Sequence, residues 1–88
     1  MKRKSFAKRR DANEPEIVQA LVQVGAKIER LDVVDLLVNF KGKIYLIEVK
    51  TENGKLTKKQ QQMLDDGWPI HIARDAGAAL LAVGAIAA

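Results

Sequence analysis

Apolar and polar positions alternate most clearly in the stretch from Val33 to Lys50, VVDLLVNFKGKIYLIEVK. Two runs rich in β-branched and other apolar residues flank Lys41-Gly42, and this pattern predicts a hairpin with a tight two-residue turn. The register that follows from this turn places Asp35 opposite Glu48. Because strand side chains alternate with a period of two, Asp35, Glu48 and Lys50 then project from one face. A three-residue loop would shift the pairing by one and separate the two carboxylates.

Hydrophobic periodicity and capping residues predict the other elements. They are a helix from Glu14 to about Val24, a strand from Ala26 to Leu31, a helix from Lys58 to about Asp66, a strand from Ile70 to Arg74 and a helix from Ala76 to about Ala87. Asn13 with Glu16 and Thr57 with Gln60 have the spacing of capping boxes. The order αβββαβα predicts an α/β domain with a mixed sheet flanked by helices, in which the helical crossover makes the last two strands parallel.

The last helix is apolar on most of its sides, through Leu80, Leu81, Val83 and Ile86. Such helices are buried, and a domain of 88 residues has little capacity to enclose one at its own end. We therefore expect part of this helix to pack on a second subunit in a homodimer.

Composition indicates one small domain in a soluble, intracellular, cytoplasmic protein. The chain has no cysteine, which excludes a disulfide framework and a thiolate metal site. The basic start leads into acidic residues rather than an apolar segment, so no signal peptide is expected. The apolar tail from Ala76 to Ala88 is too short to span a bilayer, and no membrane partner is expected.

The net charge of +4 is concentrated at the N-terminus, where residues 1–10 hold six of the fifteen basic residues and no acid. The remainder has nine basic against eleven acidic residues, a balance of −2. We therefore divide the chain into a flexible basic arm, 1–12, and a domain, 13–88. Such arms bind nucleic acid by neutralising phosphates, with Arg9 and Arg10 as candidates here. The arm alone is equally compatible with a solubilising tail.

Asp35 and Glu48 carry the sharpest chemical signal. Like charges opposite each other across two strands are destabilising, whereas a hard divalent ion such as Mg²⁺ takes carboxylate oxygens as ligands. The plainer interpretation is an edge strand in which Asp35 faces water and Glu48 pairs with Lys50 at the surface. Asp32 is the nearest rival to Asp35 as a metal ligand, but strand alternation places it on the opposite face from Glu48. The single histidine, His71, has no second soft ligand and is expected to be structural or exposed.

A helix glutamate, a hairpin aspartate and an E-x-K in the next strand resemble the PD-(D/E)xK, or restriction-endonuclease-like, nuclease core. Residues 13–75 resemble more closely the VRR-NUC (virus-type replication-repair nuclease) family, and are similar to archaeal Holliday-junction resolvases. The matching pieces are Asn13-Glu14-Pro15-Glu16, Asp35-Leu36, Ile47-Glu48-Val49-Lys50 and Gly54-Lys55-Leu56-Thr57-Lys58-Lys59-Gln60. One departure is Val34, where the family usually has proline or a small turn residue.

The resemblance implies a Mg²⁺- or Mn²⁺-dependent endonuclease on DNA, selective for branched structures such as four-way junctions and needing no small-molecule cofactor. Asp35, Glu48 and the Val49 carbonyl would bind the metal, with Lys50 acting on the attacking water. The resemblance also implies that Glu16 approaches the metal, although the residues alone favour a cap. The residues expected near DNA are Gln60, Lys55, Lys58 and Lys59.

Two other interpretations remain open from the sequence. One is a catalytically inactive, nuclease-like module that binds branched DNA. The other is a small α/β assembly protein whose charged hairpin faces solvent.

Overall fold

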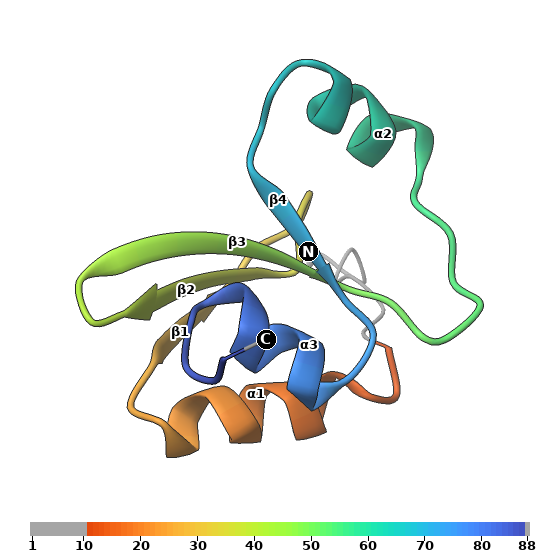
Figure 1. Ribbon diagram of the computed structural model, residues 1–88. Coiled ribbons are helices and arrows are strands. Elements are labelled where there is room, and N and C mark those ends of the chain that lie inside the picture. The colour runs from red at the N-terminus through yellow and green to blue at the C-terminus, as the bar shows by residue number, and fades with distance from the viewer. Residues whose placement is uncertain (1–10, 88) are drawn as a thin grey trace, which may run out of the picture.

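A four-stranded mixed sheet forms the centre of the computed structural model, which describes residues 11–87. The elements are α1 (Glu14–Gln23), β1 (Lys27–Arg30), β2 (Leu36–Phe40), β3 (Lys43–Val49), α2 (Lys58–Asp65), β4 (Ile70–Ala73) and α3 (Ala76–Ala82). The strand order is β1-β2-β3-β4, antiparallel until the final β3–β4 pair, which is parallel (Figure 1). The α/β class, the element order and the parallel crossover are therefore as predicted.

The hairpin has the predicted register, with Phe40 opposite Lys43 and Leu36 opposite Ile47. Lys41 and Gly42 both adopt positive φ angles, 53° and 82°, as a tight turn with the twist of a hairpin requires. The Gly42 amide also donates to Asn39 Oδ1 at 3.0 Å. Because β2 lies between β1 and β3, it is an interior strand and not the edge strand of the plainer interpretation.

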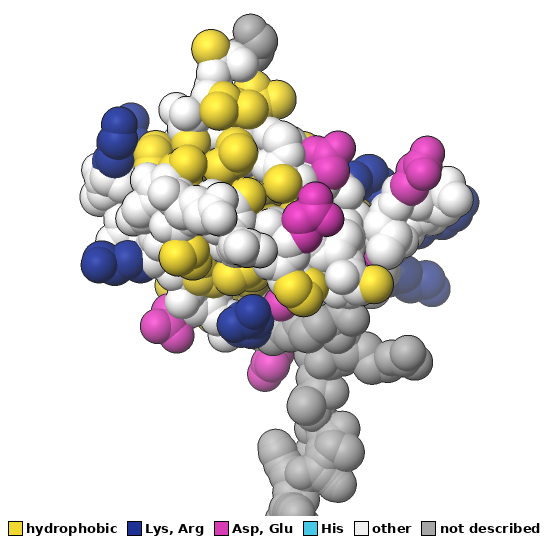
Figure 2. All heavy atoms as spheres, turned by 90° about the horizontal axis from the view of Figure 1, so that it is seen from below, with side chains coloured by type: hydrophobic (Ala, Val, Ile, Leu, Met, Phe, Trp, Pro, Cys, Tyr) yellow, Lys and Arg dark blue, Asp and Glu magenta, His cyan; other side chains and the backbone are white. Residues whose placement is uncertain are grey.

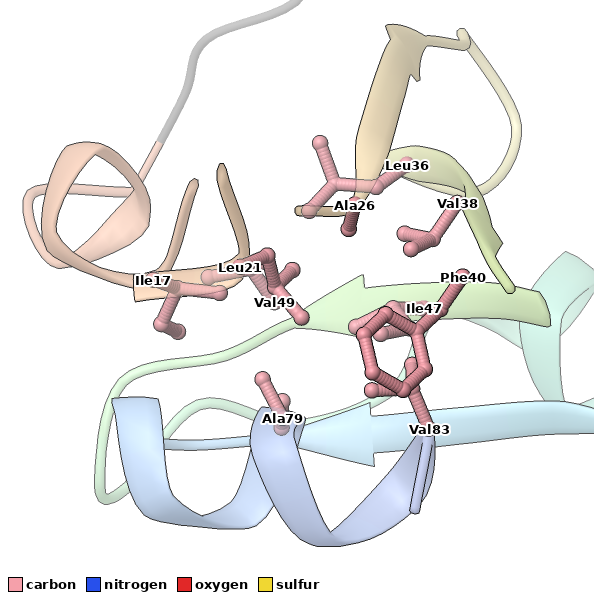
Figure 3. Packing of buried hydrophobic residues seen from close by; sticks show 11 residues of the cluster. Ile17, Leu21, Ala26, Leu36, Val38, Phe40, Ile47, Val49, Ala79 and Val83 are labelled. Carbon is pink, nitrogen blue, oxygen red and sulfur yellow. The ribbon is translucent and has the colours of Figure 1, made fainter. Parts of the chain in front are cut away.

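The hydrophobic core lies between the sheet and the pair α1 and α3, which cover the same face (Figure 1). Figure 3 shows side chains from both helices and from β2 and β3 pointing into this layer. Those buried most completely are Ile17, Leu21, Leu36, Val38, Ile47, Val49 and Ala79. Alternation puts Leu36, Val38, Ile47 and Val49 on this face, so Asp35 and Glu48 belong to the opposite one.

The last helix is shorter than predicted and packs against α1 and β4. Asp75 caps it, as expected, by accepting from the Ala78 amide at 2.8 Å, but the helix ends at Ala82 and Gly84 follows with φ of 79°. The helix contacts α1 and β4, and Ala79 is its buried residue, while Leu81 remains exposed.

Some apolar side chains remain exposed on the α1 and α3 side. Figure 2 looks onto this side and shows hydrophobic side chains across its middle with charged ones mostly towards the rim. The large exposed hydrophobic residues of these two helices and their ends are Val22, Val24, Leu81 and Ile86. This set is called the helix patch below.

The opposite face of the sheet is covered less completely, because α2 stands away from it (Figure 1). Gln60 is the buried residue of α2, and Met63 and Leu64 are only half-buried. An apolar cavity of about 330 Å³ lies on this side, lined by Leu31, Asp32, Val33, Val34, Leu46, Met63 and Trp68. Among the described helices, none is long and apolar enough to cross a membrane.

Candidate metal centre

Asp35 and Glu48 hold each other across the base of the hairpin. The Asp35 amide donates to Glu48 Oε1 at 3.2 Å, and the Val49 amide donates to Asp35 Oδ2 at 2.8 Å. Asp35 is 4% exposed and Glu48 is 2% exposed, so neither carboxylate faces open solvent. This reciprocal pairing follows from the register, because Asp35 directly precedes Leu36, whose partner Ile47 directly precedes Glu48. The interpretation of a solvent-facing charged hairpin is therefore wrong.

Lys50 brings a positive charge to the same place. Its Nζ lies 3.2 Å from Glu48 Oε2, as the shared parity of the two residues predicts. The Lys50 side chain is largely buried, so this ion pair is less screened than a surface pair. Buried carboxylates need such compensation, because an uncompensated charge in the interior is costly.

Gln60 fastens α2 to the segment that leads into Asp35. Its side chain is part of the predicted capping box: Thr57 Oγ1 accepts from the Gln60 amide at 3.1 Å, and Gln60 Oε1 accepts from the Thr57 amide at 3.0 Å. Gln60 Nε2 also donates to the Val33 carbonyl at 3.2 Å. The residue is 4% exposed. It therefore both caps its helix and positions the backbone two residues before Asp35.

The helix carboxylate that turns inward is Glu14 and not Glu16. Glu14 is 1% exposed and accepts from Arg30 Nε at 3.0 Å, whereas Glu16 is exposed. Residues two apart on a helix point in nearly opposite directions, so both could not face the sheet. The predicted capping box of Asn13 and Glu16 is not formed, because the Asn13 side chain makes no cap bond to α1. The missed signal was spacing: Glu14, Ile17 and Leu21 form one buried stripe.

The remaining predicted residues are placed as follows. Lys55, Lys58 and Lys59 are exposed on the loop before α2 and on its first turn, while Arg9 and Arg10 lie outside the described residues. Asp32 is exposed, and the Val49 side chain lies in the core, which leaves only its backbone for the site. His71 is half-buried with its ring 6.0 Å from that of Tyr45, which agrees with a structural residue.

The donor set at Asp35 and Glu48 fits a hard divalent cation. Carboxylate and backbone carbonyl oxygens are the ligands that Mg²⁺ and Mn²⁺ prefer, and Mg²⁺ commonly takes only one or two protein carboxylates with water and substrate oxygens completing its shell. Within residues 11–87 there is no group of three or more histidine, cysteine or acidic side chains that could hold a metal. A cation here would therefore rest on these two carboxylates, which suits Mg²⁺ better than a soft or fully protein-enclosed metal.

Comparison with protein-family models, with curated proteins and with solved structures finds no match for this chain.

Proposed function

We propose that the protein is a metal-dependent DNA endonuclease whose sheet is a PD-(D/E)xK core of the VRR-NUC type. The observation that carries this proposal is the arrangement of Asp35, Glu48 and Lys50. Two buried carboxylates are held against each other at the base of a hairpin, and an ammonium group lies 3.2 Å from one of them. A domain that only had to fold would gain little from placing two acids and a lysine in this position, because burial of charge is unfavourable.

Asp35, Glu48 and the Val49 carbonyl would hold Mg²⁺ or Mn²⁺. When bound, such an ion lowers the pKa of a coordinated water, polarises a phosphoryl oxygen and stabilises charge on the departing 3′ oxygen. The chain's own contribution is to orient the carboxylates through the Asp35–Glu48 exchange of hydrogen bonds. Lys50 would place positive charge beside the phosphate and orient the attacking water. A preorganised group of this kind contributes about 10²–10³ in rate.

The DNA backbone would lie along the first turn of α2. Lys58 and Lys59 are exposed there and Lys55 is exposed on the loop before it, and Gln60 in the same turn binds the segment leading to Asp35. Lysines bind phosphates without reading sequence, so affinity should fall steeply as salt rises. We further propose branched DNA as the substrate of a homodimer. The helix patch, exposed on the α1 and α3 side, supports a second copy there.

The test is cleavage of a labelled four-way junction beside matched linear duplex, with Mg²⁺, with Mn²⁺ and with EDTA. Wild type is compared with Glu48→Gln, which keeps the size of the side chain, and with Glu29→Gln, an exposed glutamate on β1. We expect metal-dependent paired cuts in the junction, retained in Glu29→Gln and reduced at least about 10²-fold in Glu48→Gln. Activity that survives in Glu48→Gln would reject this site. Equal cutting of both substrates would keep the nuclease and reject the junction preference.

One observation favours a second candidate, an inactive nuclease-like module that binds branched DNA. The described residues supply two acidic side chains at the site and not the three that a fully protein-enclosed metal would use. Tight junction binding without cleavage in either metal would select this alternative. A nuclease would use Asp35, Glu48 and Lys50 for metal binding and catalysis, whereas an inactive module would have no use for the three together.

A further inference from the structure

Asn13, the residue before α1, makes an unexpected pair of long-range contacts. Its Nδ2 donates to the Lys50 carbonyl at 3.1 Å and to the Arg74 carbonyl at 3.0 Å. One amide nitrogen carries two hydrogens and can serve both acceptors. These bonds join the start of α1 to the ends of β3 and β4. The side chain leaves its own helix uncapped, so it is used for this junction and not for the local role that its position favours.

Asn13 Oδ1 is buried and accepts no hydrogen bond from residues 11–87. A buried polar atom without a partner destabilises the fold. A smaller or apolar residue would avoid this penalty. Retaining an amide here is therefore explained by its two donated bonds, of which one goes to the backbone of Lys50.

Arg74 fixes the chain that follows Lys50. Its Nη1 lies 2.7 Å from the Thr51 carbonyl, 3.2 Å from that of Glu52 and 2.8 Å from that of Gly54. The loop therefore wraps around one guanidinium nitrogen. Charge-assisted hydrogen bonds of this kind are stronger than neutral ones.

The backbone amide, the carbonyl and the side chain of Lys50 are consequently all restrained by contacts. Its amide donates to the Ala73 carbonyl at 3.0 Å, its carbonyl accepts from Asn13, and its ammonium pairs with Glu48. β3 ends at Val49, so the strand ladder alone does not determine where Lys50 points. The contacts of Asn13 and Arg74 supply this restraint from outside the strand.

We infer that Asn13 and Arg74 are positioning residues that hold Lys50 for catalysis. The inference rests on the proposed nuclease activity. Neither residue touches the Asp35–Glu48 pair in any of the contacts described above, so each acts through the backbone of Lys50 or of the loop after it. Small displacements of a catalytic group reduce turnover strongly, by up to about 10²-fold for 1 Å.

The test is a double-mutant cycle on the cleavage rate. Asn13→Ala removes both donated bonds without removing a helix cap, since there is none to remove. We expect kcat to fall about tenfold with little change in KM in the wild-type background, and less than about twofold in a Lys50→Ala background. Arg74→Ala should behave likewise, with Arg74→Lys recovering part of the loss.

The matched control is Asp75→Ala. Asp75 adjoins Arg74 and caps α3, so its substitution weakens the start of that helix without removing a contact of Lys50. It should leave kcat unchanged at a temperature where all variants are folded. If Asn13→Ala lowers kcat equally in both backgrounds, or if Asp75→Ala lowers it as much, Asn13 is merely structural and the inference is overturned.

A second measurement separates this inference from the proposed function. Amide hydrogen exchange at Lys50 does not require activity. It should accelerate at least about fivefold in Asn13→Ala relative to Asp75→Ala if Asn13 restrains this backbone. Absence of cleavage in wild type combined with accelerated exchange would reject the nuclease but support the restraint. Unchanged exchange would overturn the inference regardless of activity.

Discussion

Gln60→Ala tests most directly how the site is held together. The substitution removes the bond from the Thr57 amide to Gln60 Oε1 and the bond from Gln60 Nε2 to the Val33 carbonyl. The backbone bond to Thr57 Oγ1 survives, so the helix start is weakened but not abolished. The lost side chain is buried, and its bond to Val33 ties α2 to the segment before Asp35.

The expected loss of stability follows from these contacts. Each hydrogen bond contributes about 1 kcal/mol net, and the removed methylene contributes about 0.8 kcal/mol more. Together these terms predict destabilisation by about 2–3 kcal/mol. For a domain of this size, such a change lowers Tm by roughly 10–20 °C.

The assay is thermal unfolding followed by circular dichroism, in EDTA so that no metal contributes. Gln61→Ala is the matched control, since Gln61 is exposed on the same helix and its side chain donates to Asp65 at 3.1 Å. Its loss should cost at most about 0.5 kcal/mol. If Gln60→Ala lowered Tm no more than Gln61→Ala, the tether from α2 to Val33 would contribute nothing and the reasoning would be refuted.

Three further predictions concern the metal, the helix carboxylate and the dimer. At about 10 mM Mg²⁺ and a Kd on the order of 1 mM, wild type should gain about 1.4 kcal/mol, or about 5–10 °C in Tm, and Asp35→Asn should gain none; equal gains would exclude this metal site. Urea unfolding should show Glu14→Gln destabilised by about 1–3 kcal/mol, because it is buried and bonds Arg30, and Glu16→Gln changed by less than about 0.5. Sedimentation velocity should detect a wild-type dimer that Leu81→Asp dissociates; a monomeric wild type would contradict the role given to the helix patch.

The hairpin and its carboxylates were predictable because the interactions that determine them are local. A two-residue turn at Lys41-Gly42 sets the register, and the period of two then brings Asp35 to Glu48. The Thr57–Gln60 capping box spans only three positions and was predicted for the same reason. Such features depend on nearby residues, so the sequence contains the whole of their explanation.

The features that were not predicted depend on contacts between distant segments. Asn13 is a residue type that commonly caps helices, but its side-chain amide donates to acceptors 37 and 61 positions away. A local rule favours the cap, and tertiary contact overrides it. The choice between Glu14 and Glu16 is similar. Both fit the first turn of a helix, and which of them is buried depends on which side of the helix faces the sheet. The extent of α3 was missed because Gly84, with positive φ, ends a run that is otherwise apolar and helix-forming.

The hydrogen bond from Asn13 to Arg74 also has a consequence for the order in which contacts can form during synthesis. Translation delivers Asp35, Glu48 and Lys50 well before Ala73 and Arg74, whose carbonyls complete the restraints around Lys50. A nascent chain in which β4 has not yet emerged can pair its hairpin. It still lacks the Ala73 carbonyl that accepts from the Lys50 amide, and the Arg74 guanidinium that binds the loop after Lys50. Long-range closures of this kind form late in folding. The pairing of the two carboxylates thus needs only the hairpin, whereas the restraints on Lys50 also need β4 and Arg74.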